Sequence, residues 1–234
     1  MRTGYHQFCA VARTLDALGS RWTLLIVREL LLRGPLVGAA IGRGLPDIPP
    51  NQLAERLTEL EALGVVRRVL EPGRARRYEL TERGRRLGPV VDALASFGLA
   101  ELDAEPSREE VLLPHVLMRQ LELRYDADRA RADGFEGRFE LEIADADSLW
   151  SLEPGEPAPR RWALHAGGHG LRVRAGACLD ADARLRMTAA RCAALVAGSR
   201  PAEDALEVTG SEARASELLD LLLPPRPMPA AAAA

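Results

Sequence analysis

The sequence predicts an α+β fold in two domains, covering residues 1–103 and 104–223, followed by a disordered tail over 224–234. Apolar residues recur at helical spacing through most of the first hundred positions. Short β-prone stretches separated by Gly, Pro and Asp fill much of the second half. Charge divides in the same way: 15 Arg against 10 Asp and Glu give +5 up to Gly98, and 16 against 24 give −8 beyond it. The basic part is therefore the candidate for an anionic partner such as nucleic acid.

The helical spacing of the first domain predicts four helices, over residues 8–18, 22–32, 37–43 and 50–63. In the fourth helix, Pro50 suits the first helical position and Gly64 suits the C-terminal cap. The third and fourth helices are joined by a short turn, and the fourth begins abruptly with polar residues. This is the organisation of a helix-turn-helix.

A hairpin is expected directly after the fourth helix. The β-prone segments 65–70 and 76–80 flank Pro72 and Gly73, which suit the centre of a type II turn. A last helical stretch follows and is expected to start with Thr81 as its N-cap. A helix-turn-helix followed by a hairpin and a helix predicts a winged helix.

The hairpin and its flanks are strongly basic, with eight Arg against three Glu over residues 67–86, in a chain whose net charge is −3. Arginines on a protruding hairpin can bind duplex phosphates or enter a minor groove while the preceding helix occupies the major groove. A solvated charged hairpin is the alternative, but the order of the elements favours DNA. The arginines expected to contact DNA are Arg74, Arg76 and Arg77.

The front of the fourth helix supplies the candidate base-reading residues. Asn51 and Gln52 stand near its N-terminus, where side chains reach base edges and amides can pair with adenine. Arg56 follows one turn later. It is expected either to contact a phosphate or to form an ion pair with Glu55 or Glu59 within the domain.

Three stretches of the first domain carry a family resemblance: "CAVARTLDALGSRWTLLIVREL", "GLPDIPPNQLAERLTELEALGVVRR" and "YELTERGRRLGPVVDALASFG". Together they resemble the winged-helix domain of HxlR-type transcriptional regulators. The resemblance implies a homodimer that binds double-stranded DNA, with the recognition helix near 50–63, the wing near 65–80 and dimer contacts from the terminal helices. The apolar stripe expected at the dimer interface comprises Leu87, Val90, Val91, Leu94 and Phe97.

The second domain is expected to start with a helix over "SREEVLLPHVLMRQLELRY", continue with four short strands, and end with a helix, a strand and a helix. This order resembles a sterol-carrier-type (type-2-like) domain over about residues 108–223. The resemblance implies a cavity for a small apolar effector, and a packed core is the alternative. The residues expected to line such a pocket are Phe135, Phe139, Trp150, Trp162 and Met187.

Other classes of site are weakly supported. His165 and His169 have a metal-ligand spacing for a helix, but the two glycines between them favour a hairpin turn, so no metal or cofactor site is expected. The sequence contains no catalytic motif that we recognise, and catalysis is not expected. Cys9 allows a thiol sensor, although a buried thiol is favoured for it, as for Cys178 and Cys192.

The function expected from the sequence is that of a cytoplasmic homodimeric DNA-binding transcription regulator controlled by a small apolar ligand. No segment predicts a membrane span or a signal peptide. Two alternatives stay open. One is a hydrophobic-ligand carrier in which the winged helix serves for dimerisation, and the other is a thiol-sensing repressor acting through Cys9.

Overall fold

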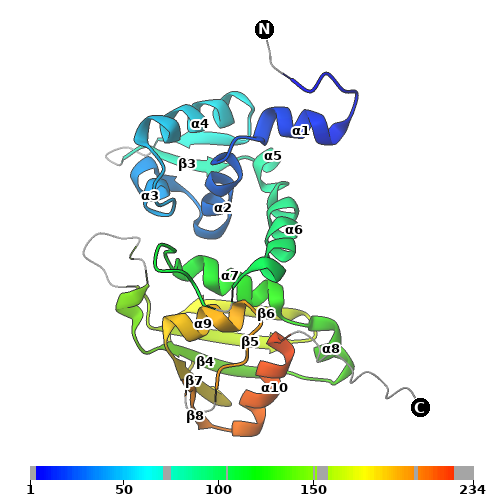
Figure 1. Cartoon of the computed structure of the whole chain (residues 1–234), viewed down its shortest axis with the longest axis vertical. Coiled ribbons are helices and arrows are strands. Elements are labelled where there is room, and N and C mark those ends of the chain that lie inside the picture. Colours follow the sequence, from blue (N-terminus) through cyan, green and yellow to red (C-terminus); the bar gives the residue numbers. More distant parts are fainter. Residues whose placement is uncertain are drawn as a thin grey trace. The chain divides into compact units, whose positions relative to one another are not determined.

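The structure, a computed structural model, describes residues 4–70, 75–103, 105–149, 151, 158–202 and 205–223 (Figure 1). The chain divides into two compact units, Met1–Leu94 and Ala95–Ala234, and each has its own hydrophobic core. Four features expected from the sequence lie outside the described residues: the turn at Pro72 and Gly73, Arg74, Trp150, and the tail over 224–234. Within the described part of the chain, no helix has the length and apolar character that crossing a bilayer requires.

The N-terminal unit contains a helical bundle and a small sheet. In chain order its elements are α1 (Ala10–Leu18), α2 (Thr23–Arg33), β1 (Leu36–Val37), α3 (Gly38–Arg43), α4 (Pro50–Ala62), β2 (Val66–Val69), β3 (Arg77–Leu80), α5 (Glu82–Arg85) and the start of α6 (Gly88–Gly98). The antiparallel sheet has the order β1-β3-β2. This confirms the expected winged helix, to which the unexpected two-residue strand β1 adds an outer strand.

Local signals in the sequence explain several boundaries of this unit. Gly64 adopts φ +67°, the left-handed conformation that ends α4 at little cost for glycine. Thr81 caps α5, because its Oγ1 accepts a hydrogen bond from Gly84 N at 3.1 Å. The expected continuous helix over 81–98 is wrong, however. It breaks between α5 and α6, where Pro89 lacks the N–H that a continuous helix would need.

A buried carboxylate holds α2 to α3. The side chain of Glu29 is fully buried and forms ion pairs with Arg28 at 2.9 Å and with Arg33 at 3.3 Å. The two arginines also donate to backbone carbonyls beyond α2, Arg28 to Gly44 O and Arg33 to Ala40 O. The helix that precedes the recognition helix is therefore fixed by a charged network as well as by apolar packing.

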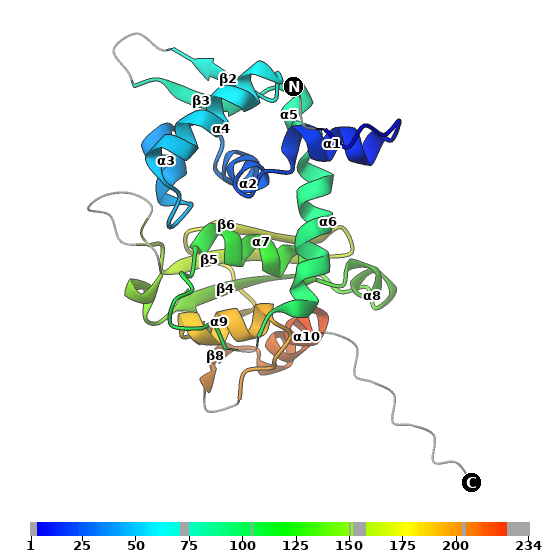
Figure 2. The same ribbon diagram turned by 45° about the horizontal axis from the view of Figure 1, so that its top comes forward.

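The C-terminal unit is a five-stranded sheet with helices on one face (Figures 1 and 2). Its main elements are α7 (Pro114–Arg124), α8 (Ala127–Ala132), β4 (Gly137–Ile143), β5 (Arg161–Gly167), β6 (Gly170–Ala175), β7 (Ala183–Met187), α9 (Ala189–Val196), β8 (Glu207–Gly210) and α10 (Glu212–Leu222). The strand order is β6-β5-β4-β7-β8, with β4 and β7 parallel and the other pairs antiparallel. The α+β class is thus confirmed.

Alternating burial shows which face of this sheet is covered. On β5, Trp162, Leu164 and Ala166 are buried in the same core as the inward side chains of α7, α9 and α10, whereas Arg161 and His165 point away and are exposed. Two expectations fail in this unit. The helix expected from residue 107 begins only at Pro114, which suits a first helical position and not an interior one, and α8 was not foreseen.

Candidate nucleic-acid interface

The recognition helix α4 separates polar and apolar residues along its length. Leu53, Leu57 and Leu60 are buried in the core of the N-terminal unit, so the helix is fixed by its leucine face. Asn51 and Gln52 lie in its first turn and are exposed. Figure 2 shows α4 alongside the β2–β3 hairpin. The fold therefore presents a polar helix start next to a wing, as duplex recognition requires.

A contact within the unit constrains Gln52. The indole Nε1 of Trp22 donates a hydrogen bond to Gln52 Oε1 at 3.0 Å. Because an indole N–H is a donor only, the amide oxygen of Gln52 is its partner, and the amide nitrogen is left as the outward donor. A bidentate contact with adenine uses both atoms of the amide. The bond to Trp22 occupies one of the two lone pairs of that oxygen, so it fixes the orientation in which the Gln52 amide meets a base.

Arg56 takes the second of the two roles that the sequence left open. It forms ion pairs with Glu59 at 2.6 Å and with Glu55 at 3.0 Å. Both partners belong to α4. These pairs compete with any phosphate contact that Arg56 could make.

The arginines that the structure describes in the wing fall into two groups. Arg67 forms an ion pair with Glu79 at 2.5 Å, and Arg68 forms one with Glu61 at 2.8 Å. Over the described residues, neither Arg76 nor Arg77 has an ion-pair partner. Arg76 is exposed, and Arg77 is half-buried at the start of β3. The two described arginines named from the sequence are thus the ones whose charge is not already neutralised within the wing.

The stripe expected at the dimer interface divides into a buried and an exposed part. Leu87 and Val91 are half-buried against the core of the N-terminal unit. Along α6, Val90 is 44%, Leu94 52% and Phe97 77% exposed. Exposed apolar side chains at this spacing indicate a contact surface, and only the exposed set is free for it.

A second apolar stripe was missed from the sequence. Phe8, Val11 and Leu15 are 105%, 67% and 46% exposed, on α1 and just before it. Their spacing of three and four residues places them on one side of the helix, and this spacing was the signal available in the sequence. The sequence analysis named none of these three residues, because helical spacing shows which side chains share a face but not whether that face is exposed.

The described residues expected to line an apolar pocket lie in the core of the C-terminal unit. Phe135, Phe139, Trp162 and Met187 are all buried, and the rings of Phe135 and Phe139 stack with centroids 6.1 Å apart. Two buried polar atoms of this core, Trp162 Nε1 and Tyr125 Oη, have no hydrogen-bond partner in the described part of the chain. Burial raises the pKa of Tyr125 to about 12.

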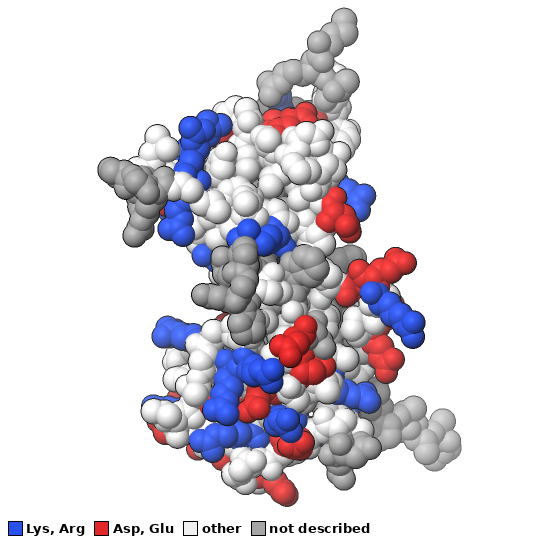
Figure 3. Space-filling model, turned by 90° about the vertical axis from the view of Figure 1, so that its left-hand side faces the viewer, with Lys and Arg blue, Asp and Glu red and all other residues white. Residues whose placement is uncertain are grey.

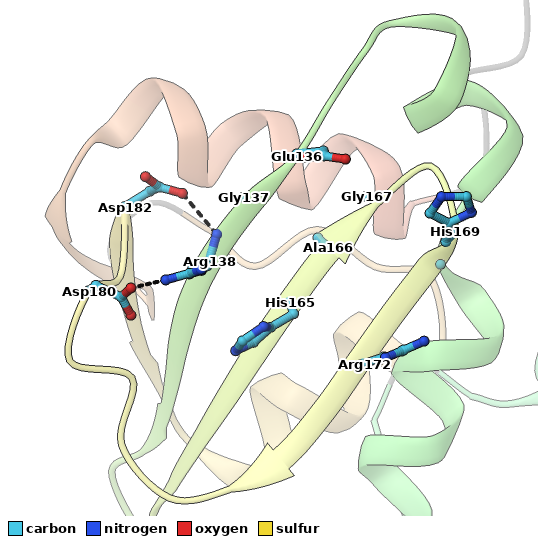
Figure 4. Close-up of a pocket in the computed structure, with 11 residues that line it drawn as sticks. Glu136, Gly137, Arg138, His165, Ala166, Gly167, His169, Arg172, Asp180 and Asp182 are labelled. Atoms are coloured by element: carbon cyan, nitrogen blue, oxygen red, sulfur yellow. Dashed lines mark hydrogen bonds and ion pairs between the residues drawn. The ribbon is translucent and has the colours of Figure 1, made fainter.

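A hollow of this unit lies instead on the exposed face of its sheet, over β4, β5 and β6 (Figure 4). It is lined by side chains of mixed charge, including Arg138, His165, Arg172 and Asp182. His169 lies in the hairpin turn between β5 and β6, as the glycines predicted. Among the residues that the structure describes, no group of three His, Cys, Asp or Glu side chains is placed to hold a metal ion. Basic and acidic side chains also intermix over the face of this unit that Figure 3 shows.

The three cysteines differ in accessibility. Cys178 and Cys192 are buried as expected, and burial raises the pKa of Cys192 to about 12. Cys9 is exposed, so its expected burial is wrong. It directly precedes α1, a helix that leaves much of its apolar surface uncovered, which explains why the thiol has no covering core.

Comparisons with known proteins concern mainly the first half of the chain. Residues 17–106 match a family described as HxlR-like helix-turn-helix. The uncharacterized HTH-type transcriptional regulator YvaP of Bacillus subtilis is 36% identical over 93 residues, which cover 39% of this chain and 85% of YvaP. The uncharacterized HTH-type regulator sll1512 of Synechocystis is 32% identical over 99 residues, covering 42% of this chain and 73% of sll1512.

Solved structures are similar to part of the chain. The crystal structure of a MarR-family transcriptional regulator from Porphyromonas gingivalis aligns with a TM-score of 0.39 and 26% identity, over 41% of this chain and 95% of that chain. The matched family and the named relatives are transcriptional regulators and not enzymes.

Proposed function

The chain belongs to the HxlR-like helix-turn-helix family of DNA-binding transcriptional regulators, and from this premise we propose that it binds operator DNA as a homodimer through α4 and the wing. In this proposal α4 enters the major groove with Asn51 and Gln52 at the base edges. The wing binds the phosphate backbone through its unpaired arginines. A chromosomal target agrees with the cytoplasmic location expected from the sequence.

The proposal rests on two neighbouring features: the exposed polar first turn of α4, and wing arginines that have no ion-pair partner among the residues that the structure describes. The leucine face of α4 is buried, so its polar first turn is held outward. The neighbouring hairpin neutralises Arg67 and Arg68 but leaves Arg76 and Arg77 without an ion-pair partner in its described part. Unpaired arginines gain most from phosphate because no internal ion pair has to be broken.

The homodimer is supported by the two apolar stripes of the N-terminal unit and α6. Leu94 and Phe97 on α6, together with Phe8 and Val11 at α1, are large apolar side chains more than half exposed. Their burial against a second copy would remove this surface from water and join two recognition helices. A winged helix that reads two half-sites needs such a dimer.

Selection of bound duplexes from a random-sequence pool tests the proposed function. The full chain is expected to enrich a two-fold symmetric sequence whose half-sites lie about one helical turn, roughly 10 base pairs, apart or a multiple of it. The chain with Leu94→Glu is the control. Used in the same selection, it is expected to enrich no symmetric sequence. Failure of the parent chain to enrich any sequence would overturn the proposal.

A second proposal concerns the C-terminal unit, which we infer to be a binding unit for a neutral apolar effector. Its order of strands and helices supports the expected sterol-carrier likeness, and the unpartnered Trp162 Nε1 supports an interior that accepts a polar atom of a ligand.

A compound bound there should quench Trp162 fluorescence, raise the melting temperature and change operator affinity. Trp162→Phe should abolish the quench. If no apolar compound in a broad thermal-shift screen stabilises the chain, the unit is architectural.

A further inference from the structure

We propose that a hollow in the N-terminal unit, away from the DNA-reading surface, binds a small organic acid with an apolar body. The hollow has a volume of about 590 Å³, within the roughly 300–1,000 Å³ typical of ligand pockets. It is formed by α1, the end of α4, the residue before β2, α5 and the residue before α6. All of these elements belong to one compact unit.

The floor of the hollow is apolar. Five aliphatic side chains line it: Ala17, Leu18, Leu63, Val65 and Leu87. Leu18 and Val65 are buried, and the other three are half-buried against the core of the unit. The floor is therefore a fixed part of the fold and offers contact area to a hydrocarbon or aromatic group.

Three arginines, Arg13, Arg83 and Arg86, surround this apolar floor. Each is exposed, and none forms an ion pair within the described residues. The described residues that line the hollow include no Asp or Glu. Arg85, in the same turn as Arg83 and Arg86, behaves differently: it pairs with Glu82 at 3.4 Å and donates to Leu80 O at 2.8 Å. Within this turn, the arginines without an ion pair are thus the two that line the hollow.

DNA recognition does not account for these arginines. Leu63 and Val65 place the hollow at the C-terminal end of α4, whereas Asn51 lies in the first turn of that helix. A helix of 13 residues is about 20 Å long, which separates the hollow from base contacts made by the front of α4. The strand β2 likewise starts near the hollow and runs toward the wing tip. The charge of the hollow therefore needs another partner.

The chemistry of the lining identifies the class of ligand. Guanidinium groups bind carboxylates through paired hydrogen bonds, and the aliphatic floor favours an apolar group of the same molecule. A neutral apolar compound would leave the arginines without a partner, and a purely ionic ligand would leave the floor uncovered. An amphipathic carboxylic acid satisfies both parts.

A ligand bound in the hollow can change DNA binding through α1. This regulatory part of the inference rests on the proposed function. α1 contributes Arg13 to the hollow and also carries the exposed Val11 and Leu15. An acid bound by Arg13 of α1 and Arg83 of α5 links the two helices and fixes the position of α1. The position of α1 in turn determines how it packs at the proposed dimer contact. Such a ligand changes operator affinity if it binds the two dimer geometries unequally.

Titration calorimetry of the full chain without DNA tests the site. Octanoate and benzoate are the probes, and octanol and benzyl alcohol are their neutral counterparts. We expect saturable binding of at least one acid at one site per chain, and at least about tenfold weaker binding of its alcohol.

Substitutions test the arginines themselves. The double variant Arg83→Gln with Arg86→Gln, and separately Arg13→Gln on another element, should each weaken binding of the acid about tenfold. Arg85→Gln is the matched control and should leave acid binding unchanged.

The results separate the site from the proposed function. Absence of saturable acid binding, equal binding of acid and alcohol, or equal binding by the parent and both arginine variants would each overturn the site. Melting temperatures equal to the parent's would show that the variants fold. Duplex binding measured with and without the acid then tests regulation. If the acid binds but no duplex does, the proposed function fails and the site stands; an unchanged duplex affinity overturns the regulatory role.

Discussion

At the scale of single residues, the hydrogen bond from Trp22 to Gln52 orients one of the two amides that α4 offers to a base. Trp22→Phe keeps an aromatic body but frees the amide oxygen of Gln52. We expect this variant and Gln52→Ala to change preference at the same base position, by about 1–3 kcal/mol, with little effect on random duplex. Asn51→Ala should change a different position. Competition among duplexes from the selection measures these preferences, and variants that keep the parent's order would exclude both amides from readout.

Glu29 illustrates what a sequence does not reveal about one residue. In the printed sequence it only interrupts an apolar run, yet its side chain is fully buried between Arg28 and Arg33. Glu29→Gln should lower the free energy of unfolding by about 2–4 kcal/mol, because the buried side of Arg33 loses its counter-charge. Glu79→Gln, which breaks the more exposed pair with Arg67, should cost about 0–1 kcal/mol. Urea unfolding compares the two. Equal losses would show that the Glu29 network adds nothing beyond surface pairing.

At the scale of elements, the stripes on α1 and α6 carry the predicted assembly. Leu94→Glu places a charge where a partner helix should pack, and we expect monomers in sedimentation together with loss of tight operator binding. Phe8→Glu should act in the same direction. Leu179→Glu is a matched control, since Leu179 is 92% exposed in a loop of the C-terminal unit, and it should stay dimeric. A dimeric Leu94→Glu chain would place the interface elsewhere.

The elements themselves were largely predictable, and the errors have physical causes. Strands such as β4 and β7 were found because apolar residues alternate with charged ones, a local signal. The helix boundaries at Pro89 and Pro114 were missed, since apolar spacing continues across each proline while the backbone hydrogen bonds do not. The exposure of α1 was missed for a different reason. Helical spacing shows which residues share a face but not whether another element covers it.

At the scale of the whole molecule, the division of charge anticipated two units, one basic and one acidic. The winged helix was predictable because its elements follow one another in the sequence. The arginine-lined hollow was not, because Arg13 and Arg83 are brought together only by tertiary packing. Likewise, the sequence named Phe135 and Trp162 as apolar, but whether they surround a cavity or fill a core depends on the packing of the entire unit.

If unpaired wing arginines bind duplex phosphates next to the recognition helix, their loss must change the salt dependence of duplex binding. The chain with Arg76→Ala and Arg77→Ala is compared with the parent and with Arg67→Ala, which removes an arginine already paired with Glu79. Each phosphate contact contributes about 0.9 to the slope of log affinity against log salt. We expect a slope shallower by about 2 units for the double variant and nearly the parent's slope for Arg67→Ala. A double variant that keeps the parent's slope would contradict the proposed phosphate contacts.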